Sequence, residues 1–295
     1  MAELFLQAPL LFVAVAFAFA LMIGSFLNVV IYRLPIMMQR EWRDQCKELQ
    51  ESPAPEIPQG RFNLVVPRSR CPTCGKEIKA WQNIPVLSYL LLGAQCANCQ
   101  ASISVRYPLV EVFTAAAAAV CAWHFGFGWE ALLAIGLSCV LVTISLIDVD
   151  TQLIPDSIVL PLLWVGLAMS LFHPMAGADT LFIDPKDAII GALAGYLSLW
   201  SVYWLFKLAT GKEGMGYGDF KLLAVLGAWL GWQMLPLIIL LSAVVGAIVG
   251  IAMIILLDRD HQVPIPFGPY LAGAGLIALL WGQPIIDAYK NYSGL

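Results

Sequence analysis

Long apolar runs separated by short polar stretches dominate the chain. A helix needs about 20 mostly apolar residues to cross a hydrocarbon core of roughly 30 Å. Seven runs approach this length, and an eighth, 219–232, is shorter. The pattern predicts an all-α, polytopic integral membrane protein with about eight transmembrane helices. The seven longer runs cover residues 9–32, 108–125, 130–147, 157–173, 187–208, 233–257 and 267–285.

The short run 219–232 holds only about three to four helical turns at 1.5 Å per residue. Such a helix must tilt, thin the bilayer locally or be shielded by its neighbours. The first run, 9–32, lacks a basic region before it and a small-residue cleavage site after it. We therefore expect a retained first helix rather than a cleaved signal peptide.

One polar insertion interrupts the apolar pattern, at residues 33–107. It is the one candidate for a separately folded loop. The predicted organisation is a first transmembrane helix in residues 1–32, a cytoplasmic loop in 33–107 and a helical membrane core in 108–295.

The composition supports this class, because 60% of the 295 residues are hydrophobic, 12% are charged and the mean hydropathy is +0.80. An ordinary soluble domain with a polar shell is excluded. Residues 33–107 hold ten of the sixteen Lys and Arg, and loops around 207–221 and 258–266 hold four more. Basic loops face the cytoplasm. Eight crossings then put the N-terminus and the loop 174–186 outside.

The net charge of −4 conceals a split, with +4 in residues 33–107 and −8 in the remainder. A modest positive loop beside a membrane is an orientation signal with some affinity for anionic headgroups. It is not a nucleic-acid footprint, so we expect lipid and no nucleic acid as a partner.

Two C-x-x-C pairs, Cys71 with Cys74 and Cys96 with Cys99, are separated by 21 residues. Each short turn can aim two thiolates at one point, and two turns complete the tetrahedral four-sulfur site typical of structural zinc. Redox-active or empty thiols are the alternative. Because structural disulfides are disfavoured on the cytoplasmic side, we expect one zinc ion that stabilises a loop too small for its own core.

Acidic residues stand at the borders of two apolar runs. Asp148 and Asp150 close one run and Asp219 opens another, after Gly216 and Gly218. Two carboxylates brought within a few Å share one proton, which supplies the general base and the general acid that peptide hydrolysis needs. The alternative is that these aspartates only cap helices. On residue chemistry alone both interpretations stay open.

Several motifs in order resemble the type IV prepilin peptidase family, and the resemblance spans most of the chain. A short glycine-rich string ending in Asp arises by chance, whereas the ordered set is specific. The matching stretches are GSFLNVVIYRLP from Gly24, the double C-x-x-C followed by ISVRYPLVE, IDVDTQLIPD from Ile147, GYGD from Gly216 and IPFGPYLA from Ile265.

The resemblance implies a membrane aspartic endopeptidase at the cytoplasmic face of the bacterial inner membrane, with a periplasmic N-terminus. Its substrates are type IV prepilins and type II secretion pseudopilins, from which it removes a basic leader. Asp219 corresponds to the acid of the family's G-x-G-D motif. Asp148 corresponds to the acid eight positions before Asp156, with Asp150 as its competitor.

The resemblance also implies N-methylation of the new N-terminal residue with S-adenosylmethionine. The chain has no strand, glycine-rich loop and helix unit of the dinucleotide-binding type. By elimination, the loop 33–107 is the predicted contributor to the methyl-donor site, and no binding residue is assigned.

Other residues are assigned supporting roles. Gly216 and Gly218 allow a tight turn and close approach to Asp219. Lys221 either biases the ionisation of the aspartates or marks the membrane border, and the border is favoured. Glu111 lies one turn inside a helix, where a structural ion pair or a protonated acid is favoured over a catalytic role. Gly268, with the prolines around it, predicts a rigid corner near the acids.

Three other functions fit parts of the pattern. A proton-coupled transporter predicts acids near mid-membrane and repeated half-helices, whereas these acids lie at one border. A thiol-disulfide oxidoreductase predicts a reactive cysteine pair on the oxidising side. A non-catalytic scaffold gives no reason for the GYGD loop.

Overall fold

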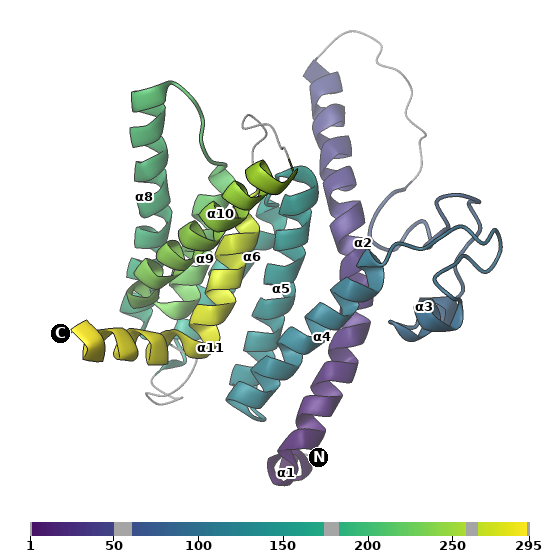
Figure 1. Cartoon of the computed structure of the whole chain (residues 1–295), viewed down its shortest axis with the longest axis horizontal. Helices are drawn as coiled ribbons and strands as arrows, with labels where there is room; N and C mark the ends of the chain where they lie inside the picture. The colour runs from purple at the N-terminus through teal and green to yellow at the C-terminus, as the bar shows by residue number, and fades with distance from the viewer. Residues whose placement is uncertain (1, 50–60, 174–182, 258–264, 294–295) are drawn as a thin grey trace. The chain divides into compact units, whose positions relative to one another are not determined.

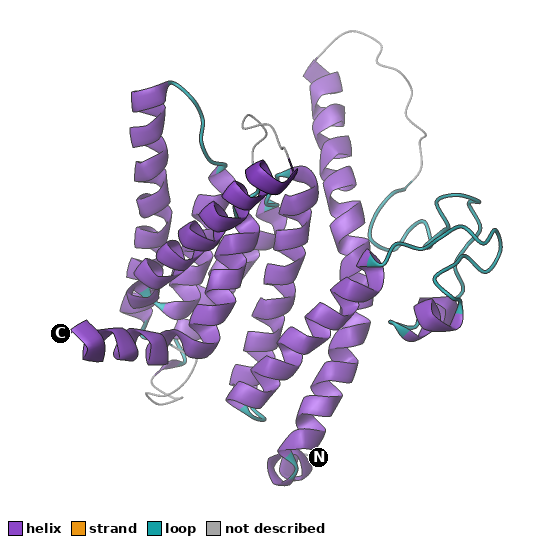
Figure 2. Cartoon of the chain, in the orientation of Figure 1, coloured by secondary structure: helices purple, strands orange, loops and turns teal. Residues whose placement is uncertain are grey.

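The computed structural model describes residues 2–49, 61–173, 183–257 and 265–293. Within these ranges the regular elements are all helical, and no β-strand occurs (Figure 2). Helices suit a bilayer because each satisfies its backbone N–H and C=O groups internally. The prediction of an all-α fold is confirmed. Part of the predicted loop 33–107 and most of the loop 174–186 lie outside the described residues.

Six helices in the described ranges are long and apolar enough to cross a membrane, which makes the chain a multi-pass membrane protein. The predicted count of about eight is not confirmed, because two apolar helices are short: α6 (Asp156–Ser170) has 15 residues and α9 (Tyr217–Leu230) has 14. The six spans lie in α2 (Pro9–Leu49), α4 (Arg106–Phe125), α5 (Trp129–Thr151), α8 (Pro185–Thr210), α10 (Leu235–Leu257) with the 3-10 turn η2 (Trp232–Met234) before it, and α11 (Gly268–Ser293).

The chain divides into two compact units, Met1–Gly126 and Phe127–Leu295. The first unit contains α1 (Ala2–Gln7), α2, the 3-10 turn η1 (Ala80–Asn83), α3 (Leu87–Leu91) and α4. The second contains the helices from α5 to α11. The predicted division into a cytoplasmic loop and a peptidase core assigns a location and a function to each part, which the two compact units do not test. It therefore stays a prediction.

In the first unit, α2 and α4 cross closely (Figure 1). A Cβ atom on Gly24 of α2 would lie 2.8 Å from the Glu111 Cα of α4, so only glycine permits this approach. The Asn28 side chain donates to the Tyr107 carbonyl at 3.2 Å near the same crossing.

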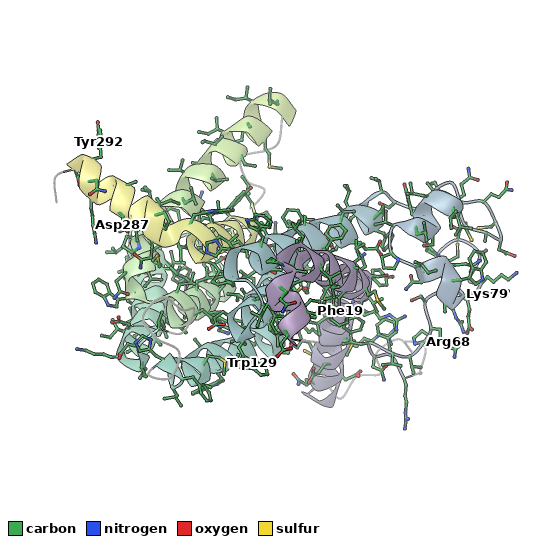
Figure 3. The ribbon with its side chains drawn as sticks, turned by 90° about the horizontal axis from the view of Figure 1, so that it is seen from below. Phe19, Arg68, Lys79, Trp129, Asp287 and Tyr292 are labelled. Atoms are coloured by element: carbon green, nitrogen blue, oxygen red, sulfur yellow. The ribbon has the colours of Figure 1, made fainter. Side chains whose placement is uncertain are left out.

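The helix α2 continues past residue 32, where the first crossing was expected to end, and reaches Leu49 with Pro35 inside it. Its 41 residues extend about 60 Å at 1.5 Å per residue, roughly twice the hydrocarbon thickness. The helix therefore projects beyond the bilayer. Between α2 and α4, the Arg68 and Lys79 side chains point outward from the loop (Figure 3).

In the second unit, α9 is the central helix. It packs against α8, α6 and α11, and Phe220, Leu223 and Leu226 are completely buried. This short helix is shielded by its neighbours, one of the three solutions expected for it. Close packing with α8 depends on glycine, because a Cβ on Gly191 would overlap the Gly227 backbone.

The helix α11 runs along α5 and then turns toward the C-terminus (Figure 1). Pro284 lies inside it, and proline bends a helix because it removes one backbone hydrogen bond and crowds the preceding turn. Beyond the bend, Asp287 and Tyr292 point away from the unit (Figure 3). The bend leaves the N-terminal half of α11 against α5, where Asp148 lies.

Candidate active site and metal centre

Asp148 lies in the last turn of α5 and is buried, with 5% of its surface exposed. The helix ends at Thr151. Its C-cap, Gln152, adopts the left-handed conformation (φ 54°) and donates its N–H to the Asp148 carbonyl at 2.8 Å. The Asp148 carboxylate accepts a hydrogen bond from the Gly268 N–H, at 2.9 Å from Oδ2. A buried carboxylate needs such a partner.

Asp219 is the third residue of α9 and is 7% exposed. Gly216 is the N-cap, with extended backbone, and the Asp219 N–H closes the turn on the Gly216 carbonyl at 3.3 Å. The Oδ1 atom of Asp219 is buried and has no hydrogen-bond partner among the residues that the structure describes. An unpaired buried oxygen of this kind is costly and points to a reactive site.

The two aspartates converge around Ile154. A Cβ on Gly218, the residue before Asp219, would lie 2.7 Å from the Ile154 Cβ. A Cβ on Gly268, which binds Asp148, would lie 3.2 Å from the Ile154 Cδ1. The structure thus gathers two buried carboxylates from the end of α5 and the start of α9.

The structure distinguishes Asp148 from Asp150, and it bears on whether the aspartates only cap helices. Asp150 is exposed, whereas Asp148 is buried. Neither Asp148 nor Asp219 occupies an N-cap position, and the N-caps of α6 and α9 are Pro155 and Gly216. Simple helix capping therefore does not explain either buried carboxylate.

Of the other predicted residues, Lys221 binds Asp156 through both carboxylate oxygens, at 2.6 and 2.7 Å. This pair joins α9 to the first residue of α6. Lys221 has a specific partner, beyond the favoured role as a border residue.

Gly216 and Gly218 differ in their surroundings. A Cβ on Gly216 would find ordinary contact, 3.7 Å from the Asp219 Oδ2, whereas one on Gly218 would collide with Ile154. The close approach expected of both glycines is therefore needed at residue 218. The group that approaches Gly218 closely is the Ile154 side chain.

Glu111 is buried in α4, with 7% exposed, and accepts the Val86 N–H at 2.7 Å through Oε2. Val86 has φ 56°, an uncommon conformation for a β-branched residue, at the start of α3. Glu111 thus anchors the loop to α4. A structural role fits this geometry.

The four cysteines of the two C-x-x-C pairs gather in the first unit, with their sulfur atoms all within 4.8 Å of one another. The sulfur atoms of Cys71 and Cys99 are 3.7 Å apart. Zn–S bonds of about 2.3 Å in a tetrahedron place sulfur atoms about 3.8 Å apart. The cluster can hold a metal ion.

Both cysteine pairs adopt the same local fold. In the first, Gly75 donates its N–H to the Cys71 carbonyl at 2.9 Å, and in the second Gln100 donates to Cys96 at 2.9 Å. Gly75 and Gln100 both have positive φ, at 70° and 58°. Two equivalent turns therefore present two sulfur atoms each.

The pKa values of Cys71 and Cys99 are shifted in opposite directions. Backbone N–H groups of Cys74 and Thr73 lower the pKa of Cys71 to about 6. The Ala101 backbone lowers the pKa of Cys99, but desolvation and the three neighbouring thiols together raise it to about 12. Four thiols this close cannot all ionise without a cation among them.

Sequence reasoning placed Gly268 in a corner near the acids but missed its hydrogen bond to Asp148, and it missed Ile154 altogether. The available signal was the Gly268-Pro269 pair just before an apolar run, because the start of a helix carries free N–H groups. Nothing in the sequence singles out Ile154.

Comparisons with known proteins agree with this site. Residues 18–125 match the bacterial peptidase A24 N-terminal domain, and residues 135–251 match the type IV leader peptidase family. The second match contains Asp148 and Asp219, and the first contains the cysteine cluster. No solved structure matches the chain.

Curated relatives match over nearly the whole length. A prepilin leader peptidase/N-methyltransferase of Stutzerimonas stutzeri is 55% identical over 99% of both chains. One from Pseudomonas aeruginosa is 55% identical over 97% of this chain and 96% of its own. One from Xanthomonas campestris is 46% identical over 98% of both. The chain belongs to the type IV leader peptidase family.

Proposed function

We propose that this protein is a membrane aspartic endopeptidase that cleaves the basic leader from type IV prepilins and type II secretion pseudopilins, and then methylates the new N-terminus. The observation that carries the peptidase assignment is the pair of buried carboxylates, Asp148 and Asp219, which α5 and α9 place on either side of Ile154. The relatives' names supply the prepilin substrates and the methyl transfer.

Asp148 and Asp219 carry the hydrolysis. One ionised carboxylate takes a proton from water, and the resulting hydroxide oxygen attacks the peptide carbonyl carbon. The protonated carboxyl gives its proton to the carbonyl oxygen. Collapse of the tetrahedral intermediate breaks the C–N bond. The leaving nitrogen receives the proton that the first carboxylate took from water, and a hydroxyl of the intermediate returns a proton to the second. Burial favours this chemistry because charge interactions strengthen away from water.

The exposed Asp150 is not assigned to the reaction. Unlike Asp150, its neighbour Asp148 is buried. Asp148 also has a backbone donor and lies near the same residue, Ile154, as the turn before Asp219. The catalytic pair is therefore Asp148 and Asp219.

The four-cysteine cluster holds one structural zinc ion. The sulfur spacing fits a ZnS₄ tetrahedron, and Cys71, Cys74, Cys96 and Cys99 leave no open position for water or substrate. The ion would fix the two C-x-x-C turns against each other in the loop between α2 and α4. A thiol-disulfide activity fits less well, because all four sulfur atoms converge on one point.

Methylation transfers the methyl group of S-adenosylmethionine to the new amine, which loses a proton. The donor-binding residues stay unassigned, and the loop 33–107 remains the predicted contributor. The topology proposed is the bacterial inner membrane, with a periplasmic N-terminus and the carboxylate pair at the cytoplasmic face. The distribution of Lys and Arg supports this orientation.

The test uses the purified full-length protein in liposomes with a prepilin substrate. Mass spectrometry and N-terminal sequencing of the product should show loss of the leader, and added S-adenosylmethionine should add the mass of one methyl group. Leader loss without methylation in the presence of the donor would remove the transferase half of the proposal. An intact prepilin under all conditions would contradict the peptidase assignment.

A further inference from the structure

The first backbone N–H of α11 is directed at the Asp148 carboxylate. Gly268 donates to Oδ2 at 2.9 Å in a buried bond that spans 120 residues of sequence. Tyr270 and Leu271 donate to the Phe267 carbonyl, and Pro269 has no N–H. Gly268 therefore carries the free donor of this helix start, and Asp148 receives it.

This hydrogen bond offsets the unfavourable position of a negative charge on Asp148. Asp148 lies in the last turn of α5, where the helix dipole disfavours negative charge. The N-terminus of α11 has the opposite sign, and a hydrogen bond from a backbone N–H stabilises an ionised carboxylate. Together they favour the charged form of Asp148.

Asp219 is placed differently. It lies in the first turn of α9, which also favours charge, but its Oδ1 is buried without a partner within the described ranges. An ionised oxygen left unpaired in the interior is costly, whereas a protonated oxygen can donate to a bound carbonyl. Of two carboxyl groups that share one proton, the group with the unpaired oxygen is the better place for it.

We propose that Gly268 is a positioning residue that fixes Asp148 as the ionised member of the pair. Asp148 then takes the proton from water, and Asp219 delivers its proton to the peptide carbonyl oxygen. This inference rests on the proposed peptidase function and assigns separate roles to its two acids.

Glycine is also required sterically at this position. A Cβ at residue 268 would lie 2.7 Å from the Asp148 Oδ2 and 3.2 Å from its Cγ. The carboxylate or the helix start would have to move. Gly273 lies in the same helix, and a Cβ there would have nothing within 4 Å, so this residue offers a matched control.

The first arm of the test compares Gly268→Ala with Gly273→Ala in the full-length protein. Positioning predicts that kcat for prepilin cleavage falls at least tenfold in Gly268→Ala while KM changes less than twofold. Gly273→Ala should keep both values. Equal kcat values in the two variants would overturn the proposal.

The second arm replaces Gly268 by glycolic acid, which exchanges the N–H for an ester oxygen without adding bulk. This variant keeps the test open if Gly268→Ala does not fold. The ester should lower kcat as alanine does. An ester variant with wild-type kcat would show that the N–H has no role.

Thermal unfolding tests whether Asp148 is the ionised acid without an activity assay. The ester should lower Tm more in the wild-type background than in Asp148→Asn, because an ionised acceptor loses more than a neutral amide when the donor is removed. Equal shifts would mean that Asp148 is neutral and would overturn the assignment.

This readout does not need cleavage, so it tests the inference even if the wild type proves inactive on prepilins. Active wild type with no effect of either change at residue 268 would reject the inference and leave the proposed function standing.

Discussion

The Lys221 ammonium lies 2.6 and 2.7 Å from the two carboxylate oxygens of Asp156, and this ion pair joins the start of α9 to the start of α6. Asp219 is two residues before Lys221, and Ile154 is two residues before Asp156. The pair therefore tethers the two segments that meet beside the carboxylates.

Replacing Lys221 by Met should lower the rate of prepilin cleavage several-fold with only a small loss of stability. Both side chains are partly exposed, at 28% and 54%, and pairs of this kind contribute up to about 1 kcal/mol. Steady-state kinetics and thermal unfolding measure the two effects. Lys212→Met, in the preceding loop, is the control.

If the pair acts as a unit, Lys221→Met combined with Asp156→Asn should be no slower than either single variant. Additive losses of cleavage rate would show that Lys221 acts on Asp148 and Asp219 independently of Asp156.

The two glycines of the GYGD turn should respond differently to alanine. Gly218→Ala should reduce cleavage strongly, because the new methyl would lie 2.7 Å from the Ile154 Cβ, which is fixed to the backbone. Gly216→Ala should be nearly silent, since its methyl finds ordinary contact and its φ of −82° suits alanine. Initial rates of prepilin cleavage by both variants test this difference, with Gly136→Ala of α5 as the control. A silent Gly218→Ala would contradict the described packing around Ile154.

Glu111 should behave as a structural acceptor. Glu111→Ala leaves the Val86 N–H without its partner and should lower the free energy of unfolding by about 1–3 kcal/mol, the cost of an unsatisfied buried donor. Glu111→Gln keeps an acceptor oxygen and should retain most stability and cleavage. Denaturant unfolding and cleavage assays compare the two, and loss of cleavage in a folded Glu111→Gln protein would instead indicate a catalytic role.

The cysteine cluster should hold one zinc ion per chain in the purified protein. A strong chelator, or Cys71→Ser, should release the metal and expose the loop to proteolysis, because the ion would join two turns of a loop whose described side chains are mostly exposed or half-buried. Metal analysis and limited proteolysis report both effects. Cys46→Ser, outside the cluster, should change neither. A metal-free protein with an equally resistant loop would argue against the zinc assignment.

The sequence was most informative where one local segment determines the outcome. Apolar length predicted most of the helices, and C-x-x-C spacing predicted a cluster that the structure assembles. The continuation of α2 to Leu49 was not predicted, because Pro35 is normally a helix breaker. The predicted count of about eight crossings is not confirmed, because α6 and α9 are short, and α9 is apolar because its side chains are buried among neighbouring helices.

Long-range contacts explain what sequence reasoning missed at the site. The partner of Asp148 is a backbone group 120 residues away, and its identity depends on how α11 packs on α5. The choice between Asp148 and Asp150 depends likewise on which face of the last turn is buried, and weak amphipathicity in a membrane helix leaves that face undefined.

The central claim is that Asp148 and Asp219 together cleave the substrate. Its most direct test is prepilin cleavage in liposomes by Asp148→Asn, Asp150→Asn and Asp219→Asn, each checked for folding and metal content. We predict that Asp148→Asn and Asp219→Asn lose at least about a thousandfold in rate, as expected when a general acid or base is removed, and that Asp150→Asn stays active. Cleavage near the wild-type rate by a folded Asp148→Asn or Asp219→Asn protein would contradict the account.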